Sequence, residues 1–423
     1  MAKQGKLLLT GTGKPRFFYG YVVVAVSFGI LTIAHGLHVS FGVFFNPLLT
    51  EFGWSRATIS GAASLSFLLM GFLAIIMGSL NDRFGPRIVI AGCGFFYGLG
   101  YLLMSQVNTI WQLYLFYGVI IGIGVSAMDV VPLSTIARWF IKKRGTMSGV
   151  LKVGTGLGIL IMPIMANWLI STYGWRTSYI ILGTLALALI ILGAQFLRRD
   201  PGQMRQLPDG KEQATAGSSD LEEEGLSLRE TIHTRQFWTI CAIYLTILFC
   251  AQTILVHIAP YAVDLGISAT NAASIISIIG GVSMVGRLVM GNAGDRVGNK
   301  RAMIICFLIL VAALFWLQLA KELWMLYLFA AIYGFAHGGF FALISPTVAG
   351  LFGMGSHGVL LGIVIFNGAV GGAIGPILAG HIFDITHSYQ LVFLILVVFS
   401  IIGLILTTLL RSISEGGIAS TGS

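Results

Sequence analysis

The stretch GSLNDRFGPR at residues 78–87 recurs as GNAGDRVGNK at residues 291–300, and this pair of segments decides the fold. Both copies place glycine at the first and eighth positions and an Asp-Arg pair at the fifth and sixth. The offset of 213 residues between them also relates Pro47 to Pro260 and Pro163 to Pro376. Because this register holds without insertion from about 47 to 163, the sequence predicts that its two halves share one fold.

Long apolar segments make up most of both halves. Hydrophobic residues are 56% of the 423 and charged residues only 10%, whereas a soluble domain carries about 25% charged residues. A membrane-spanning helix needs ~20 mostly apolar residues. We expect such helices at 18–45, 58–80, 88–106, 111–136, 145–171, 176–197, 237–262, 271–293, 302–320, 324–348, 358–383 and 390–410. The sequence therefore predicts an all-α membrane protein with twelve transmembrane helices in two pseudo-symmetric six-helix bundles.

Polar segments divide the chain into five parts. We expect a tail at 1–17, a six-helix bundle at 18–197, a linker at 198–235, a second six-helix bundle at 236–410 and a tail at 411–423. The linker contains Ala-Gly-Ser-Ser and a run of three glutamates, which is typical of a solvated tether. The first apolar run is too short for a signal peptide, so we expect no cleavage.

The distribution of basic residues predicts the orientation, because positively charged loops stay cytoplasmic. Of 25 lysines and arginines, three lie in expected outer loops and two inside helices, which leaves 20 on the inner side. We therefore expect an integral protein of the cytoplasmic (inner or plasma) membrane with both termini cytoplasmic. The net charge of +9 reflects this topology, and no nucleic-acid partner is expected. The four cysteines fall inside helices without metal-ligand spacing, so we expect them to pack.

The repeated loop motif resembles the signature of the major facilitator superfamily, and the resemblance covers essentially the whole membrane-embedded chain. Glycine permits a tight turn there, and the acidic and basic residues can pair with each other or with helix ends. The resemblance implies that the halves rock about a substrate site near the membrane midplane. The residues assigned to this conformational role are Gly78, Asp82, Arg83, Gly85, Arg87, Gly291, Asp295, Arg296 and Gly298.

Three further segments resemble the monocarboxylate porter branch of that superfamily. They are FYGYVVV at 18–24, WFIKKRGTMSGVLKVGTGLG at 139–158 and GHIFDITHSY at 380–389. The acidic residue that usually opens the first of these motifs is missing here. These matches favour the branch without deciding the substrate.

Arg287 is the leading candidate for the substrate-binding residue. It lies eight residues before Asp295, so it is about 12 Å deep in a hydrocarbon core of ~30 Å, where an arginine costs at least ~2.5 to 3.5 kcal/mol. Its repeat partner is Ala74, so the charge is not part of the shared scaffold. In the branch, an arginine of the eighth helix binds the substrate carboxylate, and the resemblance assigns this role to Arg287. The planar guanidinium suits the role, because it can donate two parallel hydrogen bonds to a carboxylate. The alternative is an arginine that snorkels to the surface or pairs structurally.

Proton coupling has several candidates. The branch usually carries an aspartate one turn before this arginine, and Ser283 stands at that position, so coupling through that carboxylate is in question. Asp129 and Lys152 lie at similar depths in the membrane, where they could form a structural or gating ion pair. The alternatives are that Asp129 binds substrate or carries protons, or that the Lys152 side chain extends to the membrane surface. Histidines titrate near physiological pH, although each is also a candidate packing residue. Among His35, His38, His257 and His337, we favour His38 and His257, because the first and seventh helices line the cavity in this superfamily.

The remaining pocket candidates are largely apolar. They are Ser283, Tyr117, Tyr333, Phe335, Phe366 and Asn367, with Phe340 nearby, and core packing is the alternative for each. Relatives that carry dicarboxylates add a lysine in the eleventh helix, and residues 364–367 contain none. One cation among apolar walls suits a small monocarboxylate anion.

We therefore expect a secondary active transporter that carries L-lactate or pyruvate together with a proton by alternating access. The alternative is an anion exchanger or an exporter of another organic acid or amphipathic compound. No nucleophile with a base, phosphate-cradling loop or metal-ligand cluster appears, so we expect neither an enzyme nor a cofactor. The expected partners are the anion, a proton and the lipid bilayer, and the need for an accessory subunit stays open.

Overall fold

The computed structural model describes residues 17–54, 56–210 and 228–410. Most of the expected 1–17 tail, the 411–423 tail and the acidic run of the linker lie outside these residues. Within them, 12 helices are long and apolar enough to cross a membrane. The expected all-α transmembrane architecture is thereby confirmed.

The first half consists of the helices α1 (Gly20–Val39), α2 (Phe41–Phe52), α3 (Arg56–Phe84), α4 (Pro86–Met104), α5 (Ile110–Leu113), η1 (Tyr114–Ile121), α6 (Gly122–Val125), α7 (Val130–Trp139), α8 (Arg144–Tyr173) and α9 (Trp175–Ala194). The linker contains the short elements η2 (Pro201–Met204), η3 (Pro208–Gly210) and α11 (Leu228–Ile232). The second half consists of α12 (Arg235–Asp264), α13 (Ala269–Val297), α14 (Asn299–Leu319), α15 (Leu323–Phe352), α16 (His357–Thr386) and α17 (Gln390–Leu409).

The fourth expected helix, 111–136, is not continuous. It begins as an α-helix, widens into the π-helix η1, and breaks in a turn at Ser126–Asp129 before α7. The Ser126 hydroxyl donates to the carbonyl of Ile123 at 2.6 Å, a local bond that competes with the helical backbone ladder. Such irregular backbone inside a membrane span is tolerated where protein buries it or a cavity adjoins it. The break places Asp129 at the N-terminus of α7 rather than in mid-helix.

The repeated motif makes the same turn in both halves. Gly85 joins α3 to α4 with a φ of +83°, and Gly298 joins α13 to α14 with a φ of +93°. Residues with a Cβ rarely adopt this left-handed region, so glycine is required at both turns. Each turn lets a long spanning helix reverse direction without intervening loop residues.

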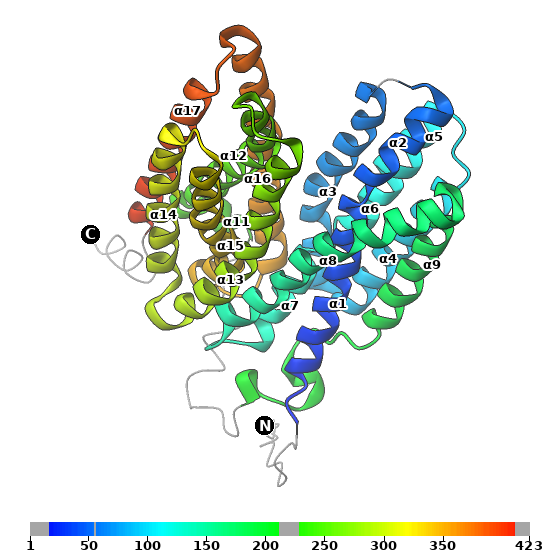
Figure 1. Ribbon diagram of the computed structural model, residues 1–423. Coiled ribbons are helices and arrows are strands. Elements are labelled where there is room, and N and C mark those ends of the chain that lie inside the picture. The colour runs from blue at the N-terminus through cyan, green and yellow to red at the C-terminus, as the bar shows by residue number, and fades with distance from the viewer. Residues whose placement is uncertain (1–16, 55, 211–227, 411–423) are drawn as a thin grey trace, which may run out of the picture.

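The two halves meet along two equivalent pairs of helices, α3 with α16 and α8 with α13. An offset of 213 residues carries α3 onto α13 and α8 onto α16, so the two contacts are related by the internal repeat. Figure 1 shows the halves converging at one end of the molecule and diverging toward the other. We call the converging end the linker side, because the described start of the linker lies there, and the turn at Gly85 borders Arg198 and Arg199 of that segment. The opposite end is the far side.

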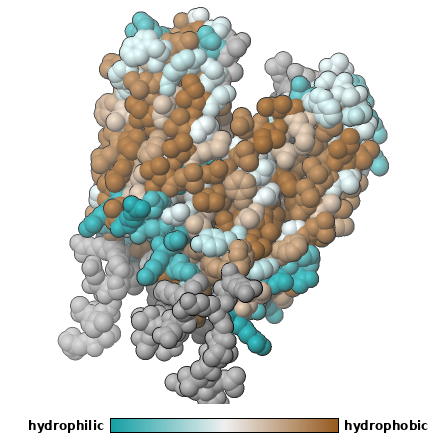
Figure 2. All heavy atoms as spheres, turned by 60° about the horizontal axis from the view of Figure 1, so that its bottom comes forward, coloured by the Kyte–Doolittle hydropathy of each residue, from teal (hydrophilic) through white to brown (hydrophobic). Residues whose placement is uncertain are grey.

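The surface agrees with a membrane setting. Figure 2 shows hydrophobic residues covering the flanks of both lobes, hydrophilic residues at the ends, and a notch between the lobes at the far side. Many large apolar side chains are exposed, among them Ile164, Ile377 and Leu394. A bilayer is the solvent that stabilises such an exterior.

Candidate functional site

Glycine pairs bring the backbones of the two halves into contact at the linker side. A Cβ added to Gly145 would strike the carbonyl oxygen of Gly291, and one added to Gly78 would strike that of Gly358. Small residues at these positions allow the close approach of helices that membrane proteins use where they pack tightly. The linker side of the molecule is therefore closed by direct backbone contact.

Two aspartates of the repeated motif cap helices of the opposite half. Asp295 on α13 accepts hydrogen bonds from the Gly145 N–H at 2.6 Å, from the Thr146 N–H at 2.7 Å and from the Thr146 hydroxyl at 2.6 Å. Asp82 on α3 accepts from the N–H groups of Gly358 and Val359, both at 3.2 Å. These donors lie in the first turns of α8 and α16, where the helix dipole favours a negative charge. We call these two sets of contacts the cross-half caps.

The other residues of the motif have smaller parts in this closure. Arg138 on α7 forms an ion pair with Asp82 at 2.8 Å. Arg83 and Arg296 are exposed, and the Arg83 guanidinium lies 5.1 Å from the centre of the Phe84 ring. Arg87 donates to the Gln195 side chain at 2.8 Å.

A charged cluster lies inside the first half, where the break in the fourth span exposes Asp129. The Asp129 carboxylate forms an ion pair with the Lys152 ammonium and lies 3.2 Å from Nε2 of His35. The Lys152 side chain is 6% exposed, but that of Asp129 is 27% exposed, so the carboxylate keeps access to a space beside the helices. The three residues come from α7, α8 and α1.

Arg287 reaches this cluster from the second half. It lies on α13 with 6% exposure, and its Nη1 donates to the Lys152 carbonyl oxygen at 2.9 Å. The Arg287 guanidinium and the Lys152 ammonium lie 6.0 and 5.8 Å from the centre of one ring, that of Phe341 on α15. In the described part of the chain no carboxylate comes within ion-pair distance of Arg287, and its Nε has no hydrogen-bond partner.

The charges of this cluster do not cancel. Two cations, Lys152 and Arg287, face one carboxylate, Asp129, which leaves one positive charge when His35 is neutral. Buried charge is costly unless it is paired, so the arrangement favours the arrival of one anion. Phe341 supplies an apolar wall against which both cations rest.

The two favoured histidines contact groups other than Asp129. His257 approaches the Tyr389 hydroxyl at 3.1 Å and the Pro376 carbonyl oxygen at 3.0 Å, so both ring nitrogens have partners on the second half. The His38 ring stacks on Tyr117 with centroids 5.8 Å apart, inside the first half. The structure thus places a different histidine, His35, against Asp129.

The predicted pocket residues are mostly engaged in packing. Tyr117 is 1% exposed and donates to the His38 carbonyl oxygen at 2.9 Å, and Tyr333 is 1% exposed and approaches that of Ala251 at 3.3 Å. Ser283 is 2% exposed and donates to the Gly280 carbonyl oxygen at 2.7 Å. Their burial and their hydrogen bonds to backbone carbonyls therefore favour a packing role for the two tyrosines and the serine.

Three further candidates are partly buried. Phe366 meets Phe72 of the opposite half with ring centroids 6.1 Å apart. Asn367 uses its amide to donate to the Ile363 carbonyl oxygen at 2.9 Å. The backbone of Phe335 lies against Gly286, one residue before Arg287. Phe366 thus contributes to the contact between the halves, and Phe335 to the contact of α15 with α13.

Sequence reasoning named His35 among four candidate histidines but favoured His38 and His257, and it did not name Phe341. One signal was available for His35: Thr32 precedes it by three residues, so both lie on one face of α1. The Thr32 hydroxyl donates to the Gly154 carbonyl oxygen of α8 at 3.0 Å, which turns that face toward Lys152. No such local signal identifies Phe341, because its role depends on how α15 packs against α8 and α13.

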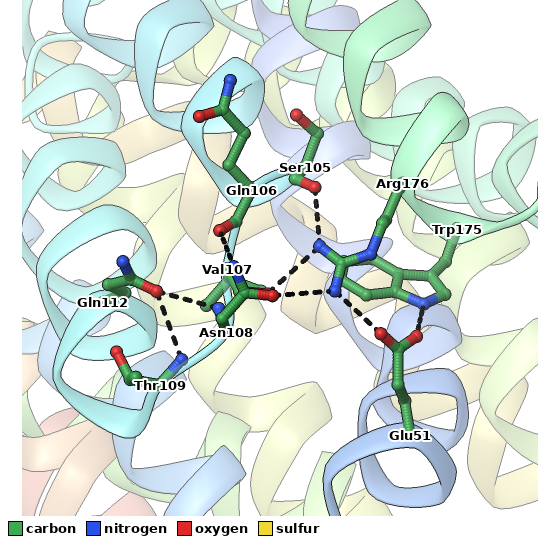
Figure 3. A network of polar contacts seen from close by, with 9 residues as sticks. All are labelled: Glu51, Ser105, Gln106, Val107, Asn108, Thr109, Gln112, Trp175 and Arg176. Carbon is green, nitrogen blue, oxygen red and sulfur yellow. Dashed lines mark hydrogen bonds and ion pairs between the residues drawn. The ribbon is translucent and has the colours of Figure 1, made fainter.

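A second polar network closes the far side of the first half. Figure 3 shows the Glu51 carboxylate between the Trp175 indole N–H at 2.6 Å and the Arg176 guanidinium at 2.7 Å. Arg176 also donates to the Ser105 carbonyl oxygen at 2.8 Å and to the Asn108 side chain at 3.1 Å. The hydrogen bond from Arg176 lowers the pKa of Glu51. The network ties the ends of α2, α4 and α9 together.

Comparison with known proteins agrees with this geometry. A sequence model described as Major Facilitator Superfamily matches residues 17–292 and 253–421. The chain is 27% identical to Monocarboxylate transporter 13 of Rattus norvegicus, over 93% of this chain and 89% of that protein. It is 27% identical to Monocarboxylate transporter 11 of Homo sapiens, over 90% and 81%. The solved structure of the proton:xylose symporter XylE has the same fold, with a TM-score of 0.73, 15% identity and coverage of 93% and 96%.

Proposed function

Since this chain belongs to the major facilitator superfamily, we propose that it is a proton-coupled symporter of a small monocarboxylate such as L-lactate or pyruvate. It is an integral membrane transporter and not an enzyme. The observation that carries the proposal is Arg287, a buried arginine between the halves with no carboxylate partner among the described residues.

Charge balance supports a monoanion as the substrate. A planar guanidinium binds a carboxylate through two parallel hydrogen bonds, and these charge-assisted bonds are strong where water is excluded. The cluster carries one excess positive charge, so one carboxylate neutralises it. The names of the relatives, which are monocarboxylate transporters, point to the same class of substrate.

The Asp129 carboxylate is the proposed proton acceptor. A substrate carboxylate beside Arg287 also lies near Lys152, whose ammonium is Asp129's partner. As Lys152 turns toward the substrate, Asp129 loses part of its stabilisation and takes up a proton, with His35 within hydrogen-bond distance to relay it. Support for His38 and His257 as carriers is weaker, because the contacts of their rings are to Tyr117 and to Tyr389 and Pro376 rather than to Asp129.

Alternating access follows from where the halves touch. The cross-half caps and glycine contacts close the linker side, and the lobes part at the far side (Figure 1). We place the linker side in the cytoplasm, because most basic residues gather there, with both termini on that side of the cytoplasmic membrane. The described conformation then receives substrate and proton from outside and releases them after the cross-half caps break.

Uptake of labelled lactate into proteoliposomes under an imposed pH gradient tests the proposal. Arg287→Gln should abolish uptake. Arg287→Lys keeps the positive charge but loses the planar guanidinium, so it should retain a small fraction of the uptake. Lys321→Gln is the matched control, because it removes an exposed cation outside the cluster. Uptake by Arg287→Gln equal to that of the control would refute the assignment of the substrate site.

Exchange or export of another organic acid or amphipathic compound is the second candidate. An aromatic contact favours it: the His337 ring meets that of Phe341 at 5.0 Å, so a second partly buried ring adjoins the one beside the cations. This function predicts that unlabelled substrate inside the vesicles stimulates uptake and that the pH gradient has no effect.

A further inference from the structure

A polar cavity lies at the linker side, outside the substrate pathway. Its volume is about 350 Å³, and it lies between the turn at Gly85, the first turn of α4 and the chain that follows α9. Three arginines line it, namely Arg87, Arg198 and Arg199. Arg198 and Arg199 have no role in the transport mechanism described above.

The charges of these arginines are not balanced by neighbours. Arg87 donates to the Gln195 side chain at 2.8 Å, and Arg198 donates to the carbonyl oxygens of Gln195 at 2.7 Å and Leu197 at 3.0 Å, all of which are neutral acceptors. The Nε of Arg199 is buried without a hydrogen-bond partner. Across the described residues no carboxylate lies within ion-pair distance of any of the three.

The nearest acidic side chain in sequence is already engaged. Asp200 accepts a hydrogen bond from the Gln203 N–H at 3.2 Å and thereby caps η2. Several unused guanidinium N–H groups around one cavity form a binding site for an oxyanion, and arginine is the residue best suited to phosphate.

The internal repeat offers a comparison for Arg87. The residue that corresponds to Arg87 is Lys300, and its ammonium donates to the carbonyl oxygen of Leu410 at 2.5 Å. Leu410 corresponds to Leu197. In both halves the cation therefore binds the chain at the end of the last helix of that half, and in the first half Arg87 also lines the cavity.

Apolar side chains complete the cavity and identify its ligand. Phe84 and Ile88 line the same space and are 50% and 62% exposed. They lie where the span of α3 ends and that of α4 begins, at the boundary between hydrocarbon and water. A ligand that contacts arginines and these side chains together needs an anionic head and an apolar tail.

We propose that this cavity binds the phosphate group of an anionic phospholipid from the linker-side leaflet. Arg87, Arg198 and Arg199 bind the phosphate oxygens, and an acyl chain runs along Phe84 and Ile88. A free phosphate offers the same head-group chemistry, but it leaves the two apolar side chains without a partner. Bound lipid links the turn between α3 and α4 to the start of the linker.

Binding of phosphatidylglycerol and phosphatidylcholine to the purified protein, measured by native mass spectrometry, tests the proposal. We expect phosphatidylglycerol to bind about tenfold more tightly, and the Arg198→Gln/Arg199→Gln variant to lose that preference, since each lost tenfold corresponds to about 1.4 kcal/mol. The control is Arg229→Gln/Arg235→Gln, which removes two exposed linker-side arginines outside the cavity and should keep the preference.

Competition on the unaltered protein separates lipid from free phosphate and does not depend on whether a variant folds. Inorganic phosphate at millimolar concentration should leave the bound phosphatidylglycerol in place. Displacement by inorganic phosphate would overturn the lipid assignment. The proposed site would be wrong if the unaltered protein bound the two lipids equally. It would also be wrong if both double variants lost the preference for phosphatidylglycerol to the same extent.

Discussion

Replacing Asp295 with asparagine should shift the protein away from the conformation described above. Asp295 accepts three hydrogen bonds from Gly145 and Thr146 of the opposite half, at 2.6 to 2.7 Å. A hydrogen bond to a charged group stabilises by about 1.5–3 kcal/mol and one between neutral groups by about 0.5–1.5 kcal/mol. In Asp295→Asn one oxygen becomes an NH2 group, which cannot accept a hydrogen bond, and the bonds to the other oxygen lose their charge assistance. At roughly 1 kcal/mol per bond, the contact weakens by about 3 kcal/mol.

This loss acts on one conformation only, because the contact breaks when the halves separate at the linker side. A difference of about 3 kcal/mol lowers the ratio of linker-side-closed to linker-side-open molecules by roughly a hundredfold. Binding of substrate from the far side should weaken correspondingly, since the open population cannot receive it there.

Distances between spin labels measure this shift. Lys143→Cys on the first half and Arg301→Cys on the second are exposed positions at the linker side. The four native cysteines are buried, so labels should attach to the introduced ones. We expect the distance distribution in Asp295→Asn to gain a longer component.

A matched control separates the cross-half cap from a general effect of charge. Asp264→Asn removes an exposed carboxylate at the far end of α12 and should leave the distribution unchanged. If Asp295→Asn and Asp264→Asn give the same distribution, the cap does not stabilise closure and the reasoning fails.

Three further predictions concern other parts of the molecule. Asp129→Asn should abolish accumulation of labelled lactate under a pH gradient while exchange between equal pools continues, and loss of exchange as well would contradict a role confined to the proton. Gly145→Ala should impair closure in the spin-label experiment because its Cβ meets a carbonyl, whereas Gly280→Ala, which has open space, should not. The pKa of Glu51 is lower in the folded protein than in the unfolded chain. Its contact with Arg176 therefore stabilises the fold at pH values above the pKa of the unfolded chain, and this stabilisation is lost as the pH falls through the pKa of the folded protein. Thermal unfolding should therefore show a smaller acid destabilisation in Glu51→Gln than in the unaltered protein.

Local patterns were sufficient for the architecture. The repeat at Gly78 and Gly291 and the twelve apolar stretches predicted two halves of spanning helices, and the structure has them. Helix formation in a membrane depends on the apolar length of each segment and on satisfied backbone groups, and both can be read along the chain. Arg287 could also be identified from the sequence as a candidate functional residue, because it places a charge deep in a spanning helix where the other repeat has Ala74.

The surroundings of that arginine required the packed molecule. The sequence favoured His38 and His257, but the packing of α1 against α8 places His35 beside Asp129 and turns His38 toward Tyr117. The break in the fourth span that exposes Asp129 was not visible in the continuous apolar pattern of 111–136.

By itself, the sequence determined which segments span the membrane, which half each belongs to and where a buried charge stands. The tertiary structure decided which charges meet: Asp295 with α8, Asp82 with α16, and His35 with Asp129. The physical reason is the range of the interactions. Hydrophobic periodicity and turn geometry act over a few neighbouring residues, whereas these contacts join residues far apart along the chain and depend on the rotation of each helix about its axis.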